Sequence, residues 1–69
     1  MVNSIKIIKD PKGTYQPNDI VKADDLIGAY CDSGASEALQ EWLWAIPRED
    51  AIGFIAGAWG IQYEVTHNS

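Results

Sequence analysis

The chain has 69 residues, with ten Asp and Glu against five Lys and Arg, and one Cys and one His. This length fits one domain and excludes a Rossmann unit, a barrel or a two-domain enzyme. The net charge of −5 argues against direct binding of nucleic acid through its phosphates. A single Cys leaves no disulfide framework and no Cys-based zinc site.

A domain this small buries little apolar surface against an ordering cost of about 1.5 kcal/mol per residue. Since no disulfide is available, the sequence predicts unusually apolar packing or self-association. The N-terminal residues lack the pattern of a signal peptide, and the longest apolar run, residues 51–61, is far shorter than the roughly 20 residues that span a membrane. We therefore expect a protein of the cytoplasm with no membrane partner.

The first 22 residues predict a strand and two turns. Residues 4–9 (SIKIIK) alternate apolar and polar side chains and are rich in β-branched residues, which is typical of a strand. The sequences DPKG at residues 10–13 and PND at residues 17–19 indicate turns. Residues 14–16 or 20–21 can then form only short extended pieces.

Three helices are predicted next. Asp24 and Asp25 favour a helix start by lying at its positive end, and Gly34 favours its stop. Ser36 is the expected N-cap of a second helix over residues 37–46. The apolar stripe of this helix follows the i, i+3, i+4, i+7 rule at Leu39, Trp42, Leu43 and Ile46.

Pro47 ends the second helix, and a third begins at Glu49 and Asp50. The same spacing rule gives it a stripe of Ile52, Ile55, Ala56 and Trp59, with Gly60 as the stop. Residues 61–65 then alternate apolar and polar side chains as a half-buried strand does.

The predicted order is therefore β-(β)-α-α-α-β. The two end strands can pair only with each other or with another chain. We predict an α+β domain over residues 1–69, with a small two- or three-stranded antiparallel sheet formed by the end strands and packed against about three helices.

Trp44 is the most informative side chain. At 100° per residue it lies opposite the apolar stripe of the second helix, beside Glu37 and Glu41. An indole on a solvent-facing side is typical of a binding hot spot. Trp44 either contacts a partner or packs beneath another element of the domain.

Acidic side chains concentrate on the helical segment. Residues 1–22 hold four Lys against two Asp, whereas residues 23–69 hold one Arg against eight acids. The negative electric field of these acids would steer a basic partner into contact. The alternative is that the acids form a solvated face and complement the positive helix N-termini. The predicted partner-binding residues are Glu37, Glu41, Trp44, Asp24 and Asp25.

Residues 51–61 (AIGFIAGAWGI) contain no polar side chain. A helix that is apolar all round is either enclosed by its own domain or lies at an interface. Gly53 and Gly57 share a face and leave room for another backbone, and Phe54 points away from the main stripe. The segment is either a central helix or a homodimer or partner seam at Gly53, Phe54 and Gly57.

No side-chain set predicts catalysis, a cofactor or a metal site. His67 lies two residues from the end of the sequence, and Cys31 is expected to be a small buried hydrophobe. Adjacent carboxylates on a helix diverge by about 100° and do not converge on a substrate. The spacing of Ala56 and Gly60 fits a helix-turn-helix, but no basic recognition helix follows. We expect no enzymatic activity.

In size, acidity and lack of catalytic residues, the chain is similar in profile to small phage or mobile-element accessory proteins. Anti-CRISPR, anti-restriction and polymerase-inhibitor proteins belong to this class. The resemblance implies an inhibitor in the host cytoplasm that covers a basic surface of its target, acting as a nucleic-acid mimic where that surface binds nucleic acid. The alternatives are an antitoxin or immunity protein bound to a cognate toxin, and a small structural homo-oligomer.

Overall fold

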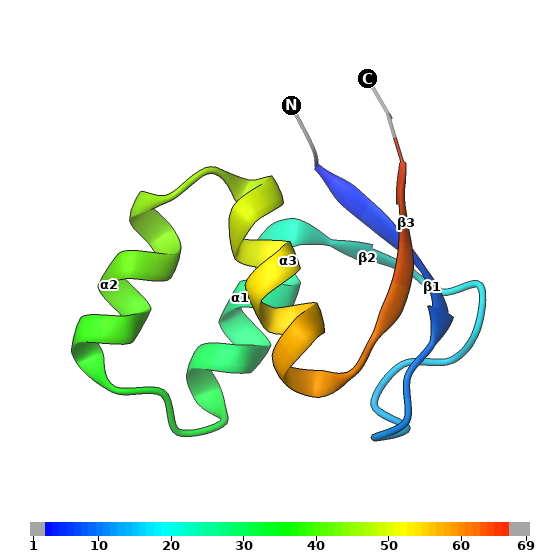
Figure 1. The fold of residues 1–69 in the computed structure, drawn as a ribbon, viewed down its shortest axis with the longest axis horizontal. Helices are drawn as coiled ribbons and strands as arrows, with labels where there is room; N and C mark the ends of the chain where they lie inside the picture. The colour runs from blue at the N-terminus through cyan, green and yellow to red at the C-terminus, as the bar shows by residue number, and fades with distance from the viewer. Residues whose placement is uncertain (1–2, 67–69) are drawn as a thin grey trace.

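The computed structural model describes residues 3–66 and confirms the predicted order of elements. The elements are β1 (Ser4–Lys9), β2 (Ile20–Lys22), α1 (Ala23–Asp32), α2 (Glu37–Ala45), α3 (Arg48–Trp59) and β3 (Gln62–Thr66). The sheet forms one side of the molecule and the three helices form the other (Figure 1). The fold is therefore the small α+β arrangement that the sequence predicts.

The three strands form one antiparallel sheet in the order β2-β1-β3. Ile5 of the central strand lies opposite Val21 of β2 and Val65 of β3. Ile5 and Ile7 are fully buried in the core that the sheet shares with the helices. The end strands pair with each other as predicted, and the short piece at residues 20–22 adds the third strand.

The helix boundaries follow local chemistry. The hydroxyl of Ser36 accepts a hydrogen bond from the backbone N–H of Leu39 at 3.2 Å, which confirms the predicted N-cap of α2. This helix ends before Ile46, whose backbone is extended at φ −81° and ψ 163°, because a following proline disfavours the helical conformation. Gly60 ends α3 in the left-handed region at φ 70°, as expected of a C-terminal glycine.

The core is formed by side chains of the sheet and of the helices, mostly α1 and α3. Its largest fully buried side chains are Ile5, Ile7, Leu26, Ile27, Leu43, Ile52 and Ile55. The helix α2 packs against α1 and α3, on the side away from the sheet (Figure 1). Leu43 is its one buried residue, so α2 is attached to the domain by a narrow contact.

Trp42 is not the core residue that the apolar spacing of α2 predicts. Its side chain is 46% exposed, and its ring meets Phe54 of α3 edge-on at a centroid distance of 5.3 Å. Leu39 and Ile46, from the same stripe, are only partly buried. The prediction fails because α2 covers the other two helices from outside, where one narrow line of side chains suffices for packing.

Of the two alternatives for residues 51–61, full enclosure within the domain is not what the structure shows. Ala51, Ile52, Ile55 and Ala56 are buried, but Gly53, Phe54, Gly57 and Ala58 are exposed. A Cβ atom added at Gly57 would meet nothing within 4 Å, so no other backbone in the described structure uses the room there. Residues 3–66 form one sheet and one group of helices, and no further layer of this part of the chain covers the outer side of α3.

Tyr15 gives the loop between β1 and β2 a testable pH dependence. Burial, and then the nearby charges of Asp10 and Asp25, raise the pKa of the Tyr15 phenol above its usual value of 10.0. The folded state therefore holds this proton more tightly than the unfolded state, and the phenol adds to the free energy of unfolding. This contribution is complete below pH 10 and falls as the pH rises through the folded pKa.

Urea denaturation between about pH 8 and about pH 11 measures this loss of unfolding free energy. Tyr15→Phe should show a smaller loss above about pH 10, because the titrating proton is gone. An identical pH profile for Tyr15→Phe and the unsubstituted chain would contradict the assignment.

Candidate protein-binding surface

Trp44 lies in the last turn of α2, and its side chain is 42% exposed. The guanidinium carbon of Arg48 lies 5.0 Å from the centroid of the indole, in a cation–π contact. The Nε of Arg48 in turn donates to Oδ1 of Asp24 at 2.7 Å. The indole therefore packs against a neighbour within its own domain and also leaves a large area exposed.

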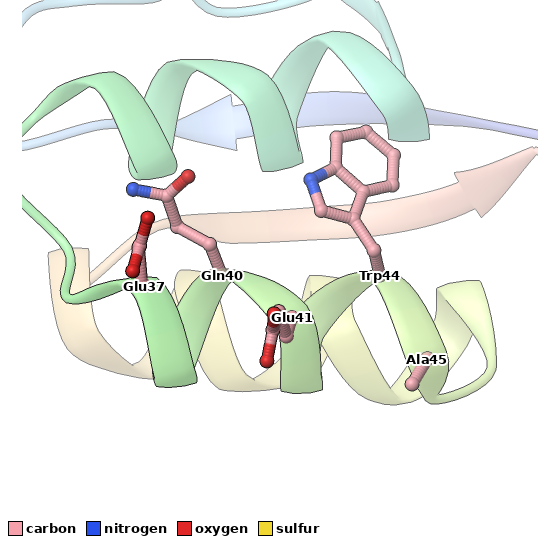
Figure 2. Close-up of a pocket in the computed structure, with 5 residues that line it drawn as sticks. All are labelled: Glu37, Gln40, Glu41, Trp44 and Ala45. Atoms are coloured by element: carbon pink, nitrogen blue, oxygen red, sulfur yellow. The ribbon is translucent and has the colours of Figure 1, made fainter.

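Two open hollows in the surface meet at Trp44. One, of about 530 Å³, is lined by Glu37, Gln40, Glu41, Trp44 and Ala45 (Figure 2). The other, of about 600 Å³, is lined by Trp44 and the following residues through Glu49. Figure 2 shows the ring of Trp44 and the amide of Gln40 projecting from the same flank of α2. The side chain of Trp44 therefore lines both hollows.

The trio of Glu37, Glu41 and Trp44 lies together, as helical spacing predicts. All three border the first hollow, and both carboxylates belong to exposed residues. Their helix is held at its start by the Ser36 cap and by Gln40, whose Nε2 donates to the carbonyl of Ala35 at 2.9 Å. These contacts give the acidic side chains a fixed helical frame.

The side chains of Asp24 and Asp25 lie near different parts of the structure. Asp24 reaches Trp44 only through Arg48, and its side chain is 67% exposed, so this ion pair orients the guanidinium more than it stabilises the fold. Asp25 instead acts on Tyr15 in the loop between β1 and β2 and lines neither hollow. Among the predicted partner-binding residues, Asp25 therefore does not lie beside Trp44.

Arg48 is the member of this surface that the sequence-based prediction lacks. It is the only Lys or Arg between residues 23 and 69, and it follows Trp44 by four positions. These two facts could have indicated a contact. Pro47 lies between the two residues, however, so they belong to different helices and helical spacing does not predict that they meet. We define the Trp44 surface as Glu37, Gln40, Glu41, Trp44 and Arg48.

The other predicted positions lie elsewhere. Phe54 is 38% exposed and contacts Trp42 and Tyr30 rather than Trp44, and Gly53 and Gly57 are exposed beside it along α3. Cys31 is buried, as expected, and His67 lies outside the described residues.

The described part of the chain, residues 3–66, brings no three or more His, Cys, Asp or Glu side chains together as a metal site. Among its helices, none has both the length and the apolar character needed to cross a membrane. The Trp44 surface offers an aromatic face, a guanidinium held by Asp24, and carboxylates.

Comparisons of the chain with models of protein families, with curated proteins and with solved structures give no match.

Proposed function

We propose that this chain is a non-catalytic inhibitor that binds a protein through the Trp44 surface and covers a basic region of it. The observation that carries the proposal is the half-exposed indole of Trp44 between two open hollows, with Glu37 and Glu41 on the same side of the helix. Large aromatic side chains supply much of the energy of protein contacts, and surrounding charges select the partner.

The charge pattern supports a basic partner. Glu37 and Glu41 are one helical turn apart and exposed, and their side chains form no ion pair within residues 3–66. Arg48 forms an ion pair with Asp24, so its positive charge repels a cationic partner less than an unpaired guanidinium would. Carboxylates spaced along a helix can occupy lysines and arginines that otherwise contact phosphates, which is how an acidic protein blocks a nucleic-acid-binding site without binding nucleic acid.

This function is that of the phage and mobile-element inhibitors, such as anti-CRISPR or other anti-host-defence proteins, that act in the host cytoplasm. An antitoxin or immunity protein would use the same contacts on a cognate toxin. The identity of the bound protein separates the two: a component of host defence or nucleic-acid metabolism supports the first, and a toxin supports the second.

Affinity capture from a host-cell lysate tests the proposal. The immobilised chain should retain a basic protein at about 50 mM salt and release much of it at about 500 mM, because salt screens exposed charges. Mass spectrometry identifies the retained protein.

The triple variant Glu37→Lys, Glu41→Lys and Trp44→Ala should lose this capture, whereas Asp25→Lys, at an exposed acid away from the Trp44 surface, should keep most of it. Equal capture of the same partner by the triple variant and the unsubstituted chain would refute the proposal.

A further inference from the structure

The face of the sheet that points away from the helices carries two lysines. Successive residues of a strand project from opposite faces, and residues in register project from the same face. Because Ile5 is fully buried in the core, its neighbour Lys6 points away from it. Lys6 pairs with Ile20 of β2 and with Glu64 of β3. Lys22 lies two residues beyond Ile20 and therefore faces the same way.

We define the outer sheet face as Lys6, Ile20 and Lys22, which form a basic and apolar area on an acidic chain. Ile20 is 56% exposed, the largest exposed fraction of any large hydrophobic side chain within residues 3–66. Neither lysine forms an ion pair within the same residues. Glu64 lies beside Lys6, but the two lysines outnumber this single acid, so the area is positive.

The Trp44 surface has the complementary charges at a similar spacing. Glu37 and Glu41 are about 6 Å apart along α2, given the helical rise of 1.5 Å per residue, and Trp44 follows on the same side. Lys6 and Lys22 occupy diagonal positions on neighbouring strands, which are about 7–8 Å apart. Two carboxylates and an indole can therefore meet two lysines and an exposed isoleucine.

We propose that the chain associates with itself head to tail, with the Trp44 surface of one copy docked on the outer sheet face of the next. The helix α2 lies on the side of the molecule away from the sheet (Figure 1), so one copy can use both surfaces at once. Such a contact does not end at two copies, because each added copy offers a further surface.

Charge complementarity selects a second copy as the occupant. Both halves of the contact are present in one chain, whereas either surface paired with itself would bring like charges together. The net charge of −5 opposes association at long range, and the contact area is small. We therefore expect dissociation constants of about 0.1–1 mM.

This inference does not rest on the proposed function, because it is measured on the chain alone. If both interactions exist, they compete, since each uses Glu37, Glu41 and Trp44. A basic protein would then be captured best by the dilute, monomeric chain.

Sedimentation equilibrium from about 20 µM to about 2 mM, at about 20 mM and at about 500 mM salt, tests the self-association. At low salt the average mass should rise from 7.6 kDa to more than twice that value, and high salt should hold it near the monomer mass. A monomer throughout the low-salt series, or a mass that stops at the dimer, overturns the proposal.

Charge reversals identify the two surfaces. Lys6→Glu with Lys22→Glu, and separately Glu37→Lys with Glu41→Lys, should each lower the association constant by about tenfold or more. The second variant is the sharper test, because each replacement makes a chain of −5 less negative and would strengthen association if overall repulsion alone decided it. An equal mixture of the two variants should associate about as tightly as the unsubstituted chain, since each reversed surface again meets its opposite.

Two further variants serve as controls, and circular dichroism checks that every variant is folded. Asp32→Lys with Asp50→Lys changes the net charge equally at exposed acids outside both surfaces and should not weaken association. Ile20→Ser changes no charge and should weaken it by about threefold or more. Undiminished association of the Glu37 and Glu41 variant or of Ile20→Ser, or no recovery in the mixture, overturns the proposal.

Discussion

Leu43→Ala is expected to lower the free energy of unfolding by about 3 kcal/mol, within the range for truncation of a buried leucine. Leu43 is fully buried and is the one buried residue of α2, so its loss leaves a cavity where α2 meets the rest of the domain. A domain of this size has a total stability of only about 3–10 kcal/mol. Urea denaturation followed by circular dichroism measures the change.

Trp42→Ala is the matched control for this prediction. It removes a larger side chain from the same helix, but that side chain is 46% exposed and makes one aromatic contact with Phe54, so the expected cost is about 1 kcal/mol. A cost equal to that of Leu43→Ala would contradict the structure and restore the sequence-based prediction that both residues are buried.

Trp44→Ala is expected to weaken binding of the captured partner by about 30-fold or more, which corresponds to about 2 kcal/mol for a hot-spot residue. The loss should appear mainly as faster dissociation, because the indole contributes contact area rather than long-range attraction. Surface plasmon resonance with the purified partner gives both rate constants.

Two comparisons make this result specific. Trp42→Ala changes a tryptophan of similar exposure on the opposite side of α2 and should leave binding within about twofold. Glu37→Gln with Glu41→Gln should slow association and reduce its dependence on salt, because these charges act before contact. Binding that is weakened equally by Trp42→Ala and Trp44→Ala would place the contact elsewhere.

Much of the fold could be predicted from the sequence because its signals are local. Alternation marked β1 and β3, the Ser36 hydroxyl marked the start of α2, and the left-handed Gly60 marked the end of α3. The pairing of β1 with β3 followed from having two clear strands at the ends of a small domain. The position of β1 at the centre of the sheet depends on β2, whose three residues carry too little pattern to predict its pairing.

Burial was harder to predict because it depends on how many layers the domain has. The apolar spacing of α2 shows which side of the helix is turned inward, but not that Leu43 alone would be covered while Trp42 remained exposed. The apolar sequence of α3 left both enclosure and an interface open, and it could not decide that the outer side, with Phe54, would have no layer of this domain over it.

The candidate site was predictable where it lies on one helix. Helical spacing placed Glu37, Glu41 and Trp44 on one side of α2, and the structure places them around one hollow. Contacts between helices were not predictable from spacing. The approach of Arg48 to both Trp44 and Asp24 depends on how three helices meet.

The most direct test of the Trp44 surface is a nuclear magnetic resonance titration of the labelled chain with its captured partner. The three tryptophans give separate indole N–H signals that report on Trp42, Trp44 and Trp59. The signal of Trp44 should shift or broaden as partner is added, while those of Trp42 and Trp59 remain in place. An unchanged Trp44 signal in a saturated complex would contradict the proposed binding surface.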